Sequence, residues 1–109
     1  MFNKHSDDGF RPLLPGIQFK TPVWGDRTSL SVFHLAKGSV IPLHSHPHEQ
    51  TGFMVSGHMR FTTGSESMDA LPGDSWCIPG GMEHAVDIIE DSVVVEVFSP
   101  VREDYLPAK

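Results

Sequence analysis

Proline and glycine interrupt this chain so often that no long helix fits between them. The 109 residues include nine prolines and ten glycines, and no segment keeps a helical period over three turns. Short runs rich in β-branched, aromatic and other apolar residues lie between the interruptions. The pattern predicts strands at 30–35, 50–56, 58–63, 75–78, 83–89 and 93–98.

Turn signals separate these runs at regular intervals. They are Lys37-Gly38, Ser56-Gly57, Thr63-Gly64, Pro72-Gly73 and Pro79-Gly80-Gly81. Many short strands joined by such turns indicate an all-β fold, either an antiparallel barrel or a double-sheet jelly roll. We expect helix only as a turn or two near either end.

The length of the chain predicts one domain spanning residues 1–109. Residues 1–22 contain three prolines and are expected to form an N-terminal arm, with one strand at 17–21. Such an arm either packs across its own barrel or adds to the sheet of a neighbour. The barrel itself is expected at 23–100, and residues 101–109 are expected to form a C-terminal tail.

Composition excludes several classes of partner and location. The net charge of −6 comes without a basic patch, which argues against nucleic acid as a partner. The N-terminus lacks the apolar core of a signal peptide, and no apolar run is long enough to span a membrane. The single cysteine, Cys77, forms neither an internal disulfide nor a thiolate cluster. We therefore expect a cytoplasmic protein.

The segment HSHPHEQ, residues 44–50, holds three histidines in five residues. On an extended strand His44 and His46 point to the same face, because side chains alternate with period two. Two imidazoles converging from one strand form half of a metal site. His48 follows Pro47, which breaks the strand, so its direction does not follow from alternation.

The spacing of residues in two segments resembles the two signatures of the cupin superfamily. The first signature is carried by Gly38, His44, His46, Gln50 and Gly57. The second is carried by Gly73, Pro79-Gly80-Gly81 and His84. Glutamine replaces the usual glutamate of the first signature, and Ile88 replaces the usual asparagine that closes the second. Together the two signatures cover residues 38–88, about half of the chain.

The resemblance implies a cupin double-stranded β-helix that holds one divalent transition metal per chain. The implied ligands are His44, His46, Gln50 and His84. Glu49 is the alternative oxygen ligand, although Gln50 fits the family spacing. Three imidazoles and an amide leave the charge of the ion uncompensated, which favours Lewis-acid chemistry over dioxygen activation. Nickel, manganese, iron, cobalt and zinc all suit such a site.

The run 92–98 near the C-terminus is nearly all apolar, and Glu96 is its one charged residue. By alternation Val94, Glu96 and Phe98 share one face of the strand. If this face lines a cavity, Glu96 is a buried carboxyl group suited to proton transfer. If the face meets solvent, Glu96 is a surface charge.

Arg102 follows this strand closely. It can close over the rim of a barrel and bind a carboxylate through two hydrogen bonds. It can equally form a rim salt bridge with Glu103 or Asp104.

Residues 30–106 are similar to the small single-domain cupins of pectin and alginate degradation, which linearise 4,5-unsaturated uronates to 4-deoxy-5-keto uronates. The similarity rests on HSHPHEQ, VSG, LPGDSW, His84 and FSPVREDYL. It implies roles at the pocket for Glu96, Phe98 and Arg102. Glutamate stands at position 96 where that group usually has aspartate, which puts the reach of the proposed base and the substrate in question.

The same similarity implies a small sugar acid as substrate and a homodimer as the assembly. Three other functions stay open on sequence grounds. One is another metal-dependent cupin enzyme, such as a dioxygenase or a polyketide cyclase. The second is a cupin that binds a sugar acid without converting it, and the third is a structural cupin without metal.

Overall fold

The computed structural model of the chain describes residues 1–107 and consists almost entirely of antiparallel strands. The all-β antiparallel prediction is therefore confirmed. The last two residues of the predicted tail, 108 and 109, lie outside the described residues. The elements are β1 (Arg11–Leu14), β2 (Ile17–Trp24), β3 (Ser29–Leu35), β4 (Val40–His44), β5 (Glu49–Thr63), β6 (Glu66–Ala70), β7 (Ser75–Ile78), β8 (His84–Ser99) and the 3-10 turn η1 (Glu103–Tyr105).

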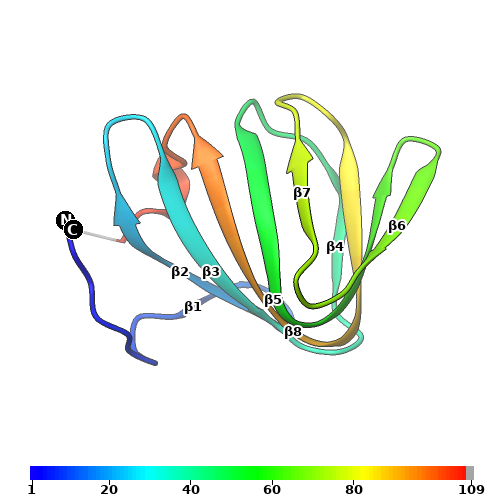
Figure 1. Cartoon of the computed structure of the whole chain (residues 1–109), viewed down its shortest axis with the longest axis horizontal. Coiled ribbons are helices and arrows are strands. Elements are labelled where there is room, and N and C mark those ends of the chain that lie inside the picture. The colour runs from blue at the N-terminus through cyan, green and yellow to red at the C-terminus, as the bar shows by residue number, and fades with distance from the viewer. Residues whose placement is uncertain (108–109) are drawn as a thin grey trace.

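The two long strands β5 and β8 run through both layers of the fold (Figure 1). The first half of β5 pairs with the second half of β8, and on this side the sheet extends through β3, β2 and β1, with β7 on the other flank. The second half of β5 pairs with the first half of β8, flanked by β6 and β4. Register shifts between residues 54 and 59 mark the bend where one layer turns into the other.

Alternation along the strands places one face of each layer against the other. In β8 every second residue from His84 to Ile88 is buried, and the alternation resumes from Ser92 to Phe98. Each large apolar side chain buried in this way contributes about 1.5 to 3 kcal/mol. The buried hydrophobic residues are Ile17, Phe19, Phe33, Leu35, Met54, Met59, Phe61, Ala70, Ile78, Val86, Ile88, Val94, Phe98 and Tyr105.

The strand bounds differ from the predicted ones in two ways. The predicted strands at 50–56 and 58–63 are one strand, β5, and those at 83–89 and 93–98 are one strand, β8. Strands β1, β4 and β6 were not predicted. The predicted arm at 1–22 contains β1 and most of β2, which pair within the chain's own sheet, so the expected boundary at residue 22 falls inside β2.

One end of the barrel is covered by loops and by the C-terminal turn. The β4–β5 and β7–β8 connections meet at this end, and η1 lies beside it (Figure 1). Tyr105 of η1 is buried and packs its ring 4.5 Å from that of Phe19 and 5.6 Å from that of Phe98. Arg11 holds the turn by donating to the carbonyl oxygens of Asp104 and Leu106. Within residues 1–107, no helix has the length and apolar character needed to cross a membrane.

Candidate metal centre and active site

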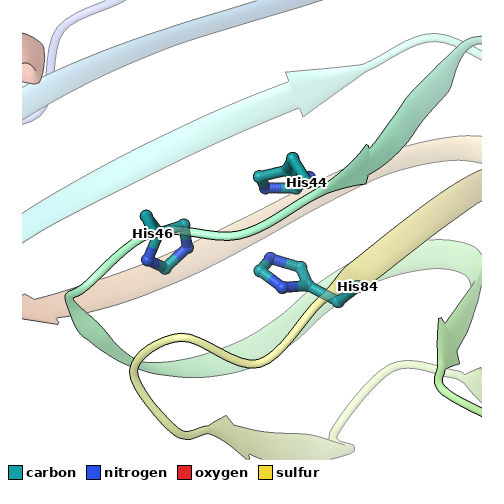
Figure 2. A group of neighbouring side chains, drawn as sticks. All are labelled: His44, His46 and His84. Atoms are coloured by element: carbon teal, nitrogen blue, oxygen red, sulfur yellow. The ribbon is translucent and has the colours of Figure 1, made fainter.

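Three histidines from two strands and a loop meet at the covered end of the barrel. His44 ends β4, His84 begins β8, and these two residues are cross-strand partners. His46 lies in the loop that follows β4, so the expectation that both imidazoles project from one strand is wrong for His46. One nitrogen of each ring lies within 4.8 Å of the others. Figure 2 shows the three rings gathered around one small space.

The two loops that carry these histidines are held against each other by backbone contacts. The Gly81 N–H donates to the carbonyl oxygen of His46 over 2.8 Å. A Cβ at position 80 would collide with the carbonyl oxygen of Pro47, so only glycine permits this close approach. The Pro79-Gly80-Gly81 turn therefore sets the distance between the His46 loop and the start of β8.

Each of the three imidazoles uses its Nδ1 atom to bind a backbone carbonyl. The partners are Pro42 for His44 at 2.9 Å, His48 for His46 at 3.0 Å and Met82 for His84 at 2.9 Å. A carbonyl oxygen only accepts hydrogen bonds, so in each ring Nδ1 carries the proton. Each Nε2 then keeps its lone pair, as in histidines that bind metals.

Burial keeps two of these rings neutral. It lowers the pKa of His46 below 6.5, with a smaller contribution from the Arg102 charge. Burial likewise lowers the pKa of His84. Neutral imidazole is the form that binds a metal ion, so both rings favour the ligating form at neutral pH.

Gln50 adds an oxygen atom to the three histidine nitrogens, and its position favours a cation at this site. Its Oε1 lies 2.9 Å from Nε2 of His46, and its amide lies close enough to Glu96 to lower the pKa of that carboxyl group. The oxygen of the amide therefore faces a ring nitrogen that carries no proton. Two lone pairs then face each other. A divalent ion between them relieves that repulsion, and three nitrogens with one amide oxygen suit a transition metal.

The structure separates the two candidate oxygen ligands. Gln50 is 7% exposed and points to the histidines, whereas Glu49 is exposed. His48 lies beside the group, with its ring centroid 5.7 Å from that of His46. His5 and His34 are exposed, and His34 stacks on Phe10.

Glu96 lies in the interior, so the alternative of a surface charge on this strand is wrong. Its side chain is 4% exposed and shares a face with Val94 and Phe98, as alternation predicts. Burial raises the pKa of its carboxyl group from 4.5 to about 8, although hydrogen bonds from Gln50 and Trp76 oppose the rise. A carboxyl group with this pKa can both give and take a proton near neutral pH.

Phe98 and Arg102 form the wall beside the histidines. The ring centroid of Phe98 lies 5.9 Å from that of His46, and the guanidinium carbon of Arg102 lies 5.2 Å above the Phe98 ring. Arg102 also stacks on Tyr105 at 3.9 Å, and its Nε donates to both carboxylate oxygens of Asp104. Arg102 thus lines the cavity and also forms one of the two rim salt bridges considered from the sequence.

A cavity of about 50 Å³ is bordered by His44, His84 and the carboxyl group of Glu96. Room of this size holds an ion and about one water molecule. The polar and aromatic lining residues are Phe33, His44, Gln50, Phe61, His84, Glu96, Phe98, Arg102 and Tyr105. A larger shallow groove of about 890 Å³ near the bend contains none of the predicted site residues.

Two contacts at this site were not predicted from the sequence. Tyr105 supports Arg102, and Trp76 binds Glu96. The sequence signal for Tyr105 is its place in FSPVREDYL. Trp76 ends the LPGDSW segment, and its link to Glu96 depends on strand register.

Comparison with known proteins decides the family. The sequence profile described as "Cupin domain" matches residues 31–99. This chain belongs to the cupin family. The cupin is 30% identical over 93 residues to the pectin degradation protein KdgF of Dickeya dadantii (strain 3937), a match that covers 84% of each chain.

Solved structures agree with this assignment. KdgF from a Halomonas species superposes on this cupin with a TM-score of 0.91 and 29% sequence identity, covering 97% of this chain and 100% of the other. An RmlC-like cupin from Shewanella frigidimarina superposes with a TM-score of 0.90 at 19% identity, covering 97% and 96%. The second likeness supports the fold alone.

Proposed function

We propose that this cupin is a metal-dependent enzyme that converts 4,5-unsaturated uronates from pectin or alginate into 4-deoxy-5-keto uronates. Its similarity to KdgF proteins, one of them described as a pectin degradation protein, supports this class of substrate. One observation carries the proposal. Three clustered imidazoles and an amide border a cavity that two of the imidazoles and the amide share with a buried carboxyl group and an arginine.

The reaction is an isomerisation that needs one group to move a proton. The O1–H proton of the hemiacetal leaves, the C1–O1 bond becomes a carbonyl, and the bond from C1 to the ring oxygen breaks. The electron pair of that bond goes to the ring oxygen, which becomes an enolate on C5. Protonation of C4 then gives the 5-keto product, so the proton lost at O1 balances the one gained at C4.

The residues of this chain supply each part of that sequence. Glu96 takes the proton from O1 as a carboxylate and delivers one to C4 as the acid. Burial raises its pKa to about 8 in the metal-free protein, and a bound cation would oppose that rise, which favours the carboxylate form that takes the proton. Arg102 pairs with the substrate carboxylate. Phe98 forms a flat apolar wall that excludes water from the reacting end.

The donor set fits a divalent transition ion. When bound, the ion supplies a Lewis acid that stabilises the negative charge developing on the substrate oxygen. His44, His46 and His84 would hold it through Nε2, and Gln50 through Oε1. All four donors are neutral, so the full charge of the ion is available to the substrate.

The test follows the ultraviolet absorbance of the conjugated C4=C5 bond in unsaturated galacturonate. The metal-loaded protein is expected to speed its loss far above the rate in buffer. His84→Ala should lose both metal, measured by elemental analysis, and activity, whereas the exposed His34→Ala should keep both. Unchanged substrate with metal bound would indicate a sugar-acid binding protein, and oxygen consumption during turnover would indicate a dioxygenase.

We further propose that the protein is a homodimer. The outward face of β5 carries Phe53 and Val55, each 49% exposed, beside the outward valines of β8. Apolar side chains gathered on a sheet face commonly mark an interface.

A further inference from the structure

The carboxyl group of Glu96 on β8 contacts the indole of Trp76 on β7, and strand β5 lies between the two strands. The indole N–H of Trp76 lies 3.2 Å from Oε1 and 3.3 Å from Oε2 of the carboxyl group. Trp76 itself is not part of the cavity lining. It therefore contacts the acid from outside the cavity lining.

The register of three strands explains how the two side chains meet. Gly52 of β5 is the cross-strand partner of both Trp76 on β7 and Glu96 on β8. Adjacent strands lie about 4.8 Å apart, so the two outer residues are separated by about twice that distance. Both side chains lean over the middle position and touch there.

Glycine at position 52 is what leaves room for this contact. A Cβ built on Gly52 would overlap the indole atoms Cε2 and Nε1 of Trp76 and also Oε2 of Glu96. Any other residue would push the indole and the carboxyl group apart. The indole is also fixed from its far side by Phe61, with a ring centroid separation of 4.8 Å.

A second polar group lies close to the carboxyl group. Gln50 lies two residues before Gly52 on the same inward face of β5, and its amide lowers the pKa of the Glu96 carboxyl group. The two hydrogen bonds that the structure gives this carboxyl group come from the indole of Trp76. Glutamate is long enough to reach the indole, whereas aspartate is one methylene shorter.

We propose that Trp76 is a positioning residue for Glu96, and that Gly52 is the small residue that admits it. This inference rests on the proposed function, in which Glu96 moves the proton. The indole holds the carboxyl group where it faces the reacting atoms, and a displacement of about 1 Å at such a group can cost on the order of 100-fold in rate.

Kinetics of the metal-loaded protein test the positioning. Trp76→Phe keeps an aromatic ring but removes the donor, and it should lower kcat by about 10- to 100-fold while KM and metal content stay within about twofold. Gly52→Ala should have a similar effect by a different route. Gly25→Ala is the matched control, because a Cβ there meets nothing within 4 Å.

A double-variant comparison separates positioning from a general effect on packing. Glu96→Asp should already lose contact with the indole, so adding Trp76→Phe should lower kcat by less than it does in the wild-type background. Independent, multiplicative losses would overturn the inference. A wild-type kcat in Trp76→Phe would overturn it as well and leave the proposed function intact.

A measurement without substrate keeps the inference testable if the protein does not convert uronates. The chain has two tryptophans, so ¹⁵N-labelled protein gives two indole N–H signals. The signal that Trp76→Phe removes should exchange slowly with solvent, and it should shift and exchange faster in Glu96→Ala. Rapid exchange in the wild type, or no response to Glu96→Ala, would overturn the contact whether or not turnover occurs.

Discussion

Replacing Glu96 by glutamine should change how the stability of the metal-free protein depends on pH. Burial raises the pKa of this carboxyl group from 4.5 to about 8. Between these values the folded protein keeps a proton that the unfolded chain has released. Stability therefore falls as pH rises through this window. Glutamine does not titrate, so this part of the pH dependence disappears in Glu96→Gln.

The size of the effect follows from the pKa difference. Each pKa unit corresponds to about 1.4 kcal/mol, so the full change between pH 4.5 and 8 is about 5 kcal/mol. Within that window the stability of Glu96→Gln should rise relative to wild type by about 1.4 kcal/mol per pH unit. His46 and His84, whose pKa values are lowered, make folding less favourable as pH falls below 6.5. Both variants share that contribution, so it cancels in the difference.

Urea unfolding in the presence of a chelator, at half-unit steps from pH 5 to 8, measures this difference directly. Only its slope with pH matters, because exchanging a hydroxyl for an NH2 group adds an offset that does not depend on pH. Glu66→Gln, at an exposed position, is the matched control and should follow the wild type. Parallel curves for wild type and Glu96→Gln would refute a carboxyl group that holds its proton in the interior.

Three further outcomes are expected. Gln50→Glu should lower kcat by at least about tenfold, because a second carboxylate would face Glu96 where an amide now donates to it; unchanged kcat in the uronate assay would contradict this. Tyr105→Leu should raise KM about three- to tenfold through loss of the stacking under Arg102, with metal content unchanged. Phe53→Asp should shift the sedimentation coefficient from that of a dimer to that of a monomer, and a monomeric wild type would rule out the proposed dimer.

The sequence predicted the sheet class well because turn residues and alternation are local signals. The sequence pattern does not predict strand β4 because Pro42 interrupts it, and proline argues against a strand except at an edge. The pattern does not predict strand β6 either, because most of its side chains are exposed and apolar residues do not alternate along it. β5 was divided at Ser56-Gly57 because a bend and a turn look alike in sequence.

The parts of the candidate site that depend on residue spacing within a motif could be predicted from the sequence. The parts that depend on the register between strands could not. The positions of His44, His46, Gln50 and His84 follow from two short motifs. The contact between Trp76 and Glu96 requires three strands to align at one glycine, and residues 20 apart in the chain give no local sign of that.

Because His44 and His84 lie on paired strands, an ion bound to both would also stabilise the fold. Strand β4 hydrogen-bonds only with β8 among the described strands, and its last residue carries one of the imidazoles. An ion bound by both residues would cross-link this edge strand to β8 and so stabilise it against the rest of the barrel. Loss of the ion would then loosen the edge first, and brief exposure to a protease would cut near residues 40–48 before the remainder of the molecule opens.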